Sequence, residues 1–423
     1  MFGSRLKGAG RRGRTIAVAG GVALALTLSG CAAGQGGGQQ GGGGEQQGNR
    51  PDIPAVSTLP VPANAANPAG NGQAQCAATT TLAYAGALTG SNAQLGVNIV
   101  NGVQLAIDQH NKANPNCQVQ LKRFDTEGTP DKAPGIVTQV ASEQPIVGVI
   151  GLPFSGESKA TGGIFEQAGL VHLTPSATNP ALTKNGWTTF FRALANDNVQ
   201  GPAAAKFMAG KLGAKKVCVI QDDSDYGVGL AAATNQALQA TGIDASCQDK
   251  VTTGQKDFAA VVSKIVSAQP QAVFYSGYYA EGAPLDQQLS NRGFTGVFLG
   301  PDGVKDDQFI QLAGDASNNA FFTCPCTPGE LIPEFADAYK TVSNGAAPGT
   351  YSLEGYDSAT ILLKAIDSGA TDRAAVKNYV KNYDGAGLSK QFKWDSTGEL
   401  ATTAVYGYKV ENGKIVYVGE IGN

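Results

Sequence analysis

The sequence predicts an α/β protein whose folded part consists of two lobes, each built on a doubly wound parallel sheet. Three observations lead to this prediction. Hydrophobic residues make up 42% of the 423 residues, which is enough to build a core. Short apolar runs alternate with amphipathic segments, the pattern of successive βαβ units. The stretch from Cys76 to Asn423 is longer than the roughly 250–300 residues at which a single core stops growing.

Eight short apolar runs are the candidate strands. They are Thr79–Ala85, Gln118–Phe124, Ile146–Ile150, Val171–Thr174, Lys216–Ile220, Asp244–Asp249, Ala272–Tyr275 and Gly296–Leu299. Between them, apolar residues recur three and four positions apart, which predicts helices over Val97–Ile107 and Phe258–Val266. A further helix is expected over Thr350–Ser368. Val405–Val410 and Lys414–Gly419 are expected to pair as a terminal hairpin.

The first 30 residues (1–30) have the pattern of a secretory signal peptide. Five positive residues precede an apolar stretch from Thr15 to Leu28, which is shorter than the roughly 20 residues of a membrane-spanning helix. The segment Leu28-Ser29-Gly30-Cys31 resembles a bacterial lipobox, in which the cysteine is lipidated and begins the mature chain. An ordinary signal peptide cut near Ala32 is the alternative. The lipobox implies export and a lipid anchor at Cys31 on the outer face of the cell membrane.

Residues 31–75 are expected to comprise the lipidated Cys31 and, after it, a flexible linker. Gly and Gln dominate positions 34–48, and five prolines follow between Pro51 and Pro68, so the linker should be flexible first and stiffer later. Removing the five positive charges of the signal peptide leaves 26 basic against 34 acidic residues, a charge of about −8. A nucleic-acid-binding protein needs a basic surface, so this composition disfavours that class.

Six cysteines follow Cys31, and an even number in an exported chain suggests disulfides, with fifteen possible connectivities. The first two each precede an early strand, and these strands are expected to be neighbours. The next two stand in the same relation in a later βαβ unit, which leaves the last two as a pair by exclusion. The alternative is a metal site, which would lack CxxC spacing and a nearby histidine. The expected pairs are Cys76–Cys117, Cys218–Cys247 and Cys324–Cys326, with no metal and no cofactor.

Ligand-binding groups are expected beyond the carboxyl ends of the strands, where open parallel sheets form their sites. The chain leaves these strands through Gly/Pro turns that carry hydroxyl groups, phenols or carboxylates. Ser155 precedes an apolar helical stretch, whose free N–H groups and dipole favour a carboxylate. Ser176 and Thr178 could add further donors. The alternative for all three residues is that they cap helices.

The other lobe is expected to supply a carboxylate and aromatic rings. Asp302 could neutralise an ammonium group, and Tyr226 and Tyr278 could cover the ligand. Together with the hydroxyl groups, this set fits a zwitterion. The plainer alternatives are that the tyrosines are half-buried loop aromatics and that Asp302 is a turn residue within Gly-Pro-Asp-Gly.

With these motifs, the chain resembles the bacterial substrate-binding proteins of branched-chain amino acid transport, the Leu/Ile/Val-binding type of the type I periplasmic-binding fold. The resemblance covers nearly all of residues 78–423 and rests on short motifs that occur in order. They are Gly86–Gly90, the Gly-x-x-x-Ser stretch ending at Ser155, Thr174–Thr178, Gln200-Gly201-Pro202, Asp225-Tyr226-Gly227, Lys256-Asp257-Phe258, Gly277-Tyr278 and Gly300-Pro301-Asp302-Gly303.

The resemblance implies a hinge between two lobes made of interrupted segments. Lobe one would comprise residues 76–195 plus 327–400, and lobe two residues 196–326 plus 401–423. It further implies the role of each candidate residue. Ser155 and Thr178 would bind the ligand carboxylate, Ser176 would offer main-chain contacts, Tyr226 and Tyr278 would close over the ligand, and Asp302 would bind the ammonium group.

Three residues depart from the family pattern and affect which side chain fits. Leu95 stands where an aromatic residue is found in the family. Asp302 is one methylene shorter than the usual Glu, and Phe154 occupies a position that is smaller elsewhere. These differences change the volume and reach of the expected pocket.

The implied function is capture of an amino acid, branched-chain or similarly apolar, and its delivery to an ABC permease. A ligand-sensing lipoprotein, or a binder of amides, urea or other small polar solutes, is the alternative. The sequence contains no GxSxG, HExxH, CxxC or mature SxxK motif, so no enzyme is expected. Of the two histidines, His110 is expected to be solvated on a polar helical face, and His172 to lie in the core or cleft wall.

Overall fold

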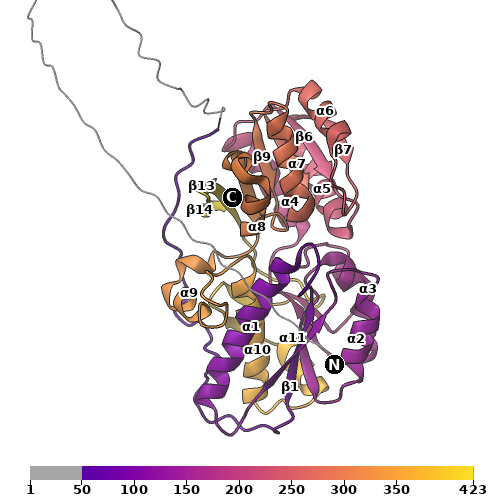
Figure 1. Cartoon of the computed structure of the whole chain (residues 1–423). Helices are drawn as coiled ribbons and strands as arrows, with labels where there is room; N and C mark the ends of the chain where they lie inside the picture. Colours follow the sequence, from indigo (N-terminus) through magenta and orange to yellow (C-terminus); the bar gives the residue numbers. More distant parts are fainter. Residues whose placement is uncertain (1–49, 423) are drawn as a thin grey trace, which may run out of the picture. The chain divides into compact units, whose positions relative to one another are not determined.

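The computed structural model describes residues 50–422, which lie within one compact unit (Figure 1). The predicted signal peptide, the lipobox and Cys31 lie outside the described residues. Within the described part, none of the helices is both long and apolar enough to cross a membrane.

The first sheet contains five parallel strands in the order β2-β1-β3-β4-β5. Its strands are β1 (Thr81–Gly86), β2 (Gln120–Asp125), β3 (Ile146–Gly151), β4 (His172–Thr174) and β5 (Phe190–Arg192). The helices of this lobe are α1 (Ala93–Ala113), α2 (Ala133–Ser142), α3 (Ser155–Gln167), α10 (Ser352–Asp367) and α11 (Arg373–Lys381). Successive side chains of a strand point to opposite faces. Accordingly, Leu82 and Tyr84 pack with α1 and α10, whereas Ala83 and Ala85 pack with α2 and α3.

The second sheet contains seven strands in the order β14-β13-β10-β9-β8-β6-β7. Its strands are β6 (Lys216–Gln221), β7 (Asp244–Lys250), β8 (Ala272–Ser276), β9 (Val297–Gly300), β10 (Ala320–Cys324), β13 (Val405–Glu411) and β14 (Lys414–Ile421). Its helices are α4 (Asp197–Gly210), α5 (Asp225–Leu238), α6 (Ala259–Ala268), α7 (Tyr279–Asn291) and α8 (Asp307–Ala313). The strands from β7 to β10 are parallel, and β13 and β14 extend the sheet as an antiparallel hairpin.

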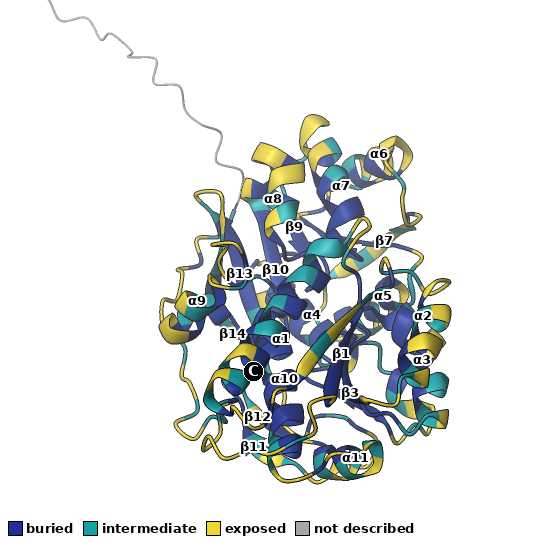
Figure 2. Ribbon diagram, turned by 60° about the horizontal axis from the view of Figure 1, so that its bottom comes forward, coloured by how far each residue is buried: buried dark blue, intermediate teal, exposed yellow. Residues whose placement is uncertain are grey.

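The chain passes between the two sheets at three points: between β5 and α4, between β10 and α9, and between β12 and β13. The remaining elements are α9 (Pro333–Tyr339), the small antiparallel pair β11 (Asp384–Ala386) and β12 (Gln391–Lys393), and the 3-10 turns η1 (Leu182–Lys184), η2 (Gly314–Asn319) and η3 (Gly329–Leu331). Figure 2 shows the central strands buried beneath helices whose outer faces are exposed.

All eight predicted strands, the three predicted helices and the terminal hairpin are present, which confirms the α/β prediction. The sequence analysis did not identify β5, β10, β11 and β12. Three of these strands are only three residues long, too short to display a period of two. Strand β10 (Ala320–Cys324) is buried throughout, so it lacks the alternation of a half-exposed strand.

The prediction for His110 was wrong, whereas that for His172 was right. His110 is fully buried, and its Nε2 lies 2.8 Å from Oδ1 of Asp367 on α10. The helix α10 covers the face of α1 that looked polar in isolation. His172 is buried between the rings of Phe165 and Phe190, and this burial lowers the pKa of His172 to about 3.

The cysteines of the described chain approach one another in three pairs. They are Cys76 with Cys117, Cys218 with Cys247, and Cys324 with Cys326. The first pair joins the start of the folded body to the segment before β2. The second bridges the adjacent strands β6 and β7, where the two cysteines face each other in register. Among residues 50–422, no group of three or more His, Cys, Asp or Glu could hold a metal ion.

Residues 50–75 contain no helix or strand, in keeping with their prolines. They nevertheless lie against the folded body, in contrast to a free linker. Ile53 and Ala74 are buried, and the N–H of Val56 donates to the carbonyl of Tyr417 at 2.8 Å. The indigo segment of Figure 1 can be followed from the β13–β14 hairpin towards α1.

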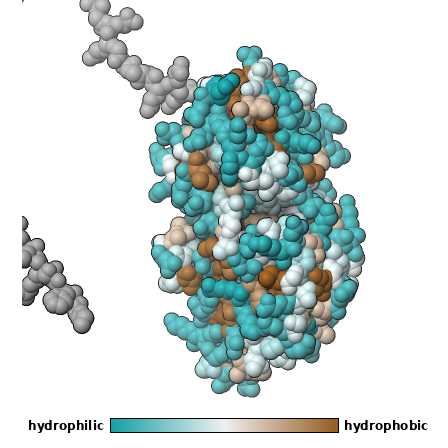
Figure 3. Space-filling model, turned by 45° about the vertical axis from the view of Figure 1, so that its right-hand side comes forward, coloured by the Kyte–Doolittle hydropathy of each residue, from teal (hydrophilic) through white to brown (hydrophobic). Residues whose placement is uncertain are grey.

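The surface of the described chain exposes few large apolar side chains, namely those of Val56, Val61, Val228 and Leu312. The face drawn in Figure 3 is mostly hydrophilic, and its apolar atoms occur in small separate patches. Most large hydrophobic side chains of the described residues are therefore buried in the interior.

Candidate functional site

Two turns of lobe one meet at the carboxyl ends of β3 and β4. Ser155 is the first residue of α3, and its Oγ accepts a hydrogen bond from the N–H of Asn179 at 3.2 Å. Ser176 donates from its Oγ to the carbonyl of Pro153 at 2.8 Å. These bonds tie the β3–α3 turn to the segment after β4. Neither hydroxyl caps a helix, so the capping alternative is wrong for both residues.

The start of α3 offers free hydrogen-bond donors. The residue before the helix is Phe154, which has no polar side chain, and no side-chain cap is formed. The N–H groups of the first turn of an α-helix have no partner within the helix. The positive end of the α3 dipole therefore points out of lobe one at Ser155, where an anion would be stabilised.

Thr178 adds a buried donor to these groups. Its Oγ1 is buried and completes no hydrogen bond within the described chain, although the Asp197 carboxyl lies near enough to interact with it. Most buried hydroxyl groups have a partner, and an unsatisfied one at a cleft is a natural point for a ligand or water. The carbonyl of Thr178 accepts from the N–H of Asp197 at 3.0 Å, which places Thr178 against the start of α4.

Asp302 is the acidic centre of the site and is only 1% exposed. Its Oδ1 accepts hydrogen bonds from Gln200, at 2.7 Å, and from the hydroxyl of Tyr226. Its Oδ2 accepts from the hydroxyl of Tyr351 at 2.6 Å. Burial raises the pKa of Asp302, while the three donors oppose that rise by stabilising the carboxylate. Asp302 does lie in a turn, but its side chain is committed to these partners rather than to the turn backbone.

Aromatic rings connect the two lobes beside this carboxylate. The ring centroids of Phe154 and Tyr278 are 4.8 Å apart, and those of Tyr278 and Tyr226 are 5.2 Å apart. Both tyrosines are buried, so the interpretation as half-buried loop aromatics is wrong. Gly303 permits this packing, because a Cβ there would lie 2.9 Å from the Tyr226 ring and 3.0 Å from the Tyr278 ring. Leu95 on α1 is fully buried in the same apolar cluster.

Direct contacts across the cleft show that the lobes are closed on each other. Asn179 of lobe one donates to the carbonyl of Asp225 at 2.7 Å, and Lys159 forms an ion pair with the Asp225 carboxylate at 2.7 Å. On the other side of the cleft, Asn98 donates to Asp306 at 3.0 Å. The hydroxyl groups, the carboxylate and the aromatic rings therefore lie at one shared, water-poor interface.

Three buried residues of the site were not assigned a role from the sequence. Gln200 belongs to the Gln-Gly-Pro motif, which contributed to the family resemblance but did not predict the hydrogen bond from Gln200 to Asp302. Tyr351 precedes α10 in a left-handed conformation with φ of 67°, and nothing in the sequence connects it to a carboxylate 49 positions earlier. Burial raises the pKa of Asp197 to about 8, so this carboxyl is largely protonated at neutral pH.

The chain matches a family model described as periplasmic binding protein over residues 79–414. It is 33% identical over 294 residues to the leucine-, isoleucine-, valine-, threonine-, and alanine-binding protein of Pseudomonas aeruginosa, which covers 68% of this chain and 78% of that protein.

Solved structures are similar over the same region. One is the branched-chain amino acid transporter substrate binding protein of Streptococcus pneumoniae in complex with isoleucine, with a TM-score of 0.73, 26% identity, and coverage of 79% of this chain and 97% of that chain. Another is a leucine binding protein from Thermotoga maritima, with a TM-score of 0.71, 29% identity, and coverage of 81% and 98%.

Proposed function

The chain belongs to the family of periplasmic binding proteins, and we propose that it captures an amino acid with an apolar side chain between its lobes and delivers it to an ABC permease. The family is extracytoplasmic, and its members bind substrates rather than transform them. The relatives whose names specify a ligand bind leucine, isoleucine and valine, among others. These names support the amino-acid class of the ligand.

The observation that carries the proposal is the opposite polarity of the two sides of the cleft. Lobe one presents the start of α3 and the unsatisfied hydroxyl of Thr178, both suited to a carboxylate. Lobe two presents Asp302, a buried carboxylate suited to an ammonium group. A zwitterionic α-amino acid has both charged groups on one carbon, so it can meet both sides at once. Excluding water strengthens each of these interactions.

The apolar surroundings favour an apolar side chain on the ligand. The rings of Phe154 and Tyr278 contact each other across the lobes, and Leu95 is fully buried in the large apolar core to which both rings belong. Leucine has about nine heavy atoms, and small ligands gain at most roughly 1.5 kcal/mol per atom. A micromolar dissociation constant needs about 8 kcal/mol. Such an affinity is therefore attainable with these contacts alone, without a metal or a covalent bond.

The experiment that tests this proposal is a binding screen of the mature chain. Each proteinogenic amino acid, urea and simple amides are tested by thermal shift, and each hit is measured by calorimetry. We expect a raised melting temperature with leucine, isoleucine or valine, because a ligand that binds the native state stabilises it by mass action. If only amides or urea bind, the ligand is another small polar solute and the proposed amino-acid ligand is wrong.

Transport and sensing use the same cleft and differ only in the partner. Uptake of the labelled ligand in a deletion strain separates them. We expect uptake to fall when the gene is removed and to recover on complementation. Unchanged uptake of every ligand that the protein binds would defeat the transport role and leave a sensing lipoprotein.

We further propose that the chain is exported by its signal peptide, anchored through lipid on Cys31, and stabilised by three disulfides. The lipobox-like segment and the three cysteine pairs support this proposal. Replacing Cys31 by Ala should release the protein to the medium or leave its signal peptide uncut. A Cys31→Ala protein that is still processed and membrane-bound would contradict lipidation.

A further inference from the structure

We propose that residues 50–75 form a strap that clamps both lobes in the closed state, so that docking of the strap and capture of the ligand favour each other. The inference rests on the proposed function, since it requires a ligand that closes the cleft. The family match begins at residue 79, so the strap lies outside the fold that the relatives share.

One half of the strap is anchored on lobe two. The guanidinium group of Arg50 donates to the carbonyl of Val410 and lies 5.2 Å from the centroid of the Phe321 ring. Ile53 is only 8% exposed, and Val56 donates its N–H to Tyr417 at 2.8 Å. Tyr417 belongs to β14, the outermost strand of the second sheet, so the strap forms a backbone hydrogen bond with a sheet edge.

The other half is anchored on lobe one. The N–H of Ala66 donates to the carbonyl of Ala386 at 2.7 Å. The side chain of Asn114, at the end of α1, donates to the carbonyl of Ala69 at 3.0 Å and accepts from the N–H of Ala74 at 3.1 Å. These contacts lie on lobe one, whereas those with the β13–β14 hairpin lie on lobe two. A change in the angle between the lobes therefore acts directly on the strap.

The stretch between the two anchors has a limited reach. Val56 and Ala66 are ten positions apart, and a chain extends by at most about 3.3–3.6 Å per residue, which allows about 35 Å. Pro60 and Pro62 restrict the backbone of this stretch further. Opening of the cleft must therefore be absorbed by this short segment or must release one of its anchors.

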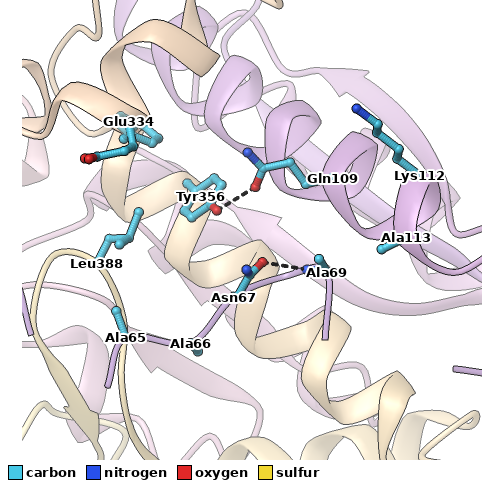
Figure 4. Close-up of a pocket in the computed structure, with 11 residues that line it drawn as sticks. Ala65, Ala66, Asn67, Ala69, Gln109, Lys112, Ala113, Glu334, Tyr356 and Leu388 are labelled. Atoms are coloured by element: carbon cyan, nitrogen blue, oxygen red, sulfur yellow. Dashed lines mark hydrogen bonds between the residues drawn. The ribbon is translucent and has the colours of Figure 1, made fainter. Parts of the chain in front are cut away.

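A cavity borders the lobe-one half of the strap. A cavity of about 620 Å³ lies between the strap, α1, α9 and α10. Figure 4 shows it lined by Asn67 of the strap, Gln109 of α1, Glu334 of α9 and Tyr356 of α10.

The clamp makes a prediction about affinity. A strap that binds only the closed form stabilises the ligand-bound state, so its loss should weaken binding through linkage. Replacing Ile53 by Asp places a charge in a buried contact on lobe two. We expect the mature Ile53→Asp chain to bind L-leucine about 3- to 10-fold more weakly, through faster dissociation. Val61 is 39% exposed within the same strap, so Val61→Asp is the matched control and should bind as wild type.

A measurement without ligand separates failure of the strap from failure of the proposed function. Spin labels placed at the exposed positions Gln139 on α2 and Val228 on α5 report the distance between the lobes. In the ligand-free mature chain, Ile53→Asp should shift the distribution towards longer distances, and Val61→Asp should not.

The outcomes are decisive in both directions. Identical ligand-free distance distributions in Ile53→Asp and wild type would overturn the clamp, whether or not leucine binds. If the distance between the spin labels is longer in Ile53→Asp but no variant binds leucine, the strap does clamp the lobes and the proposed ligand is wrong. Unfolding curves of both variants verify that the body stays folded.

Discussion

Lobe one contributes hydrogen-bond donors to the cleft, and lobe two contributes a carboxylate acceptor. The two sets of groups differ in how many hydrogen bonds they already make. Lobe one offers the first turn of α3, which has no side-chain cap, and the buried Thr178 hydroxyl, whose near neighbour is the Asp197 carboxyl. Lobe two offers an acceptor, Asp302, that already has three donors. At this interface, Asp302 has a donor on each carboxylate oxygen, whereas the first turn of α3 has no side-chain cap.

This difference indicates how a zwitterion would be bound at each end. A ligand carboxylate adds hydrogen bonds to lobe one without displacing any from Thr178. A ligand ammonium joins a carboxylate that is already held in position by Gln200, Tyr226 and Tyr351. The carboxylate end would gain contacts, and the ammonium end would gain charge neutralisation at a preorganised group.

The largest expected effect comes from removing the acceptor. Asp302→Ala should weaken binding of L-leucine by about 2–5 kcal/mol, because the ligand ammonium would be buried without its partner. Calorimetry with the mature chain measures this loss. Asp307, an exposed acidic residue five positions further on, provides the control, and Asp307→Ala should bind as wild type. Equal affinity of Asp302→Ala and wild type would remove Asp302 from the site.

The unsatisfied donor of lobe one should matter for the ligand and not for the fold. Thr178→Val removes a buried hydroxyl whose near neighbour is the Asp197 carboxyl, so binding should weaken by about 1 kcal/mol, with a smaller loss of ligand-free stability than in Thr174→Val. Thr174 is the matched control, since its hydroxyl bonds the carbonyl of Leu152 at 2.8 Å. Thr174→Val should lower stability instead. A Thr178→Val protein that loses stability but keeps its affinity would reverse this assignment.

A smaller effect should reveal how hydrogen-bond donors lower the pKa of Asp302. The Tyr351 hydroxyl opposes the rise that burial imposes on the pKa of Asp302. In Tyr351→Phe that pKa rises further, so the carboxylate is protonated at a higher pH. Affinity for leucine, followed from pH 8 to pH 4, should therefore begin to fall at a higher pH than in wild type. Superimposable pH profiles would show that the hydroxyl does not tune this carboxyl.

The smallest effect on binding is expected at a buried acid that has no donors. The Oδ2 of the buried Asp286 on α7 has no hydrogen-bond partner among residues 50–422, and burial raises the pKa of this carboxyl far above its ordinary 3.8. The folded form keeps a proton that the unfolded chain releases, so stability falls as pH rises above about 4, by at most about 1.4 kcal/mol per pH unit.

Asp286→Asn should reduce that fall, as measured by urea unfolding between pH 4 and pH 7, and should leave leucine affinity unchanged. A wild-type stability that rises over this range in parallel with the variant would contradict a neutral Asp286. Asp286 and Asp302 are two buried carboxyls of one lobe, and only Asp302 has hydrogen-bond donors that oppose the rise of its pKa.

The sequence was sufficient where local pattern decides the structure. Apolar runs located the eight strands, and the turns after them contained Ser155, Thr178 and Asp302. It was insufficient where distant segments meet. The contact of Tyr351, which precedes α10, with Asp302 and the burial of His110 beneath α10 both depend on packing between distant segments that no local pattern encodes. The prolines of residues 50–75 correctly indicated the absence of regular structure, but not the hydrogen bonds that this segment makes to the body.

A crystal structure of the mature chain with L-leucine tests the central claim most directly. The account predicts one leucine between the lobes, its carboxylate within hydrogen-bonding distance of Thr178 Oγ1 and the first turn of α3, and its ammonium group at Asp302. A leucine bound in the reverse orientation, or bound away from both groups, would contradict the account.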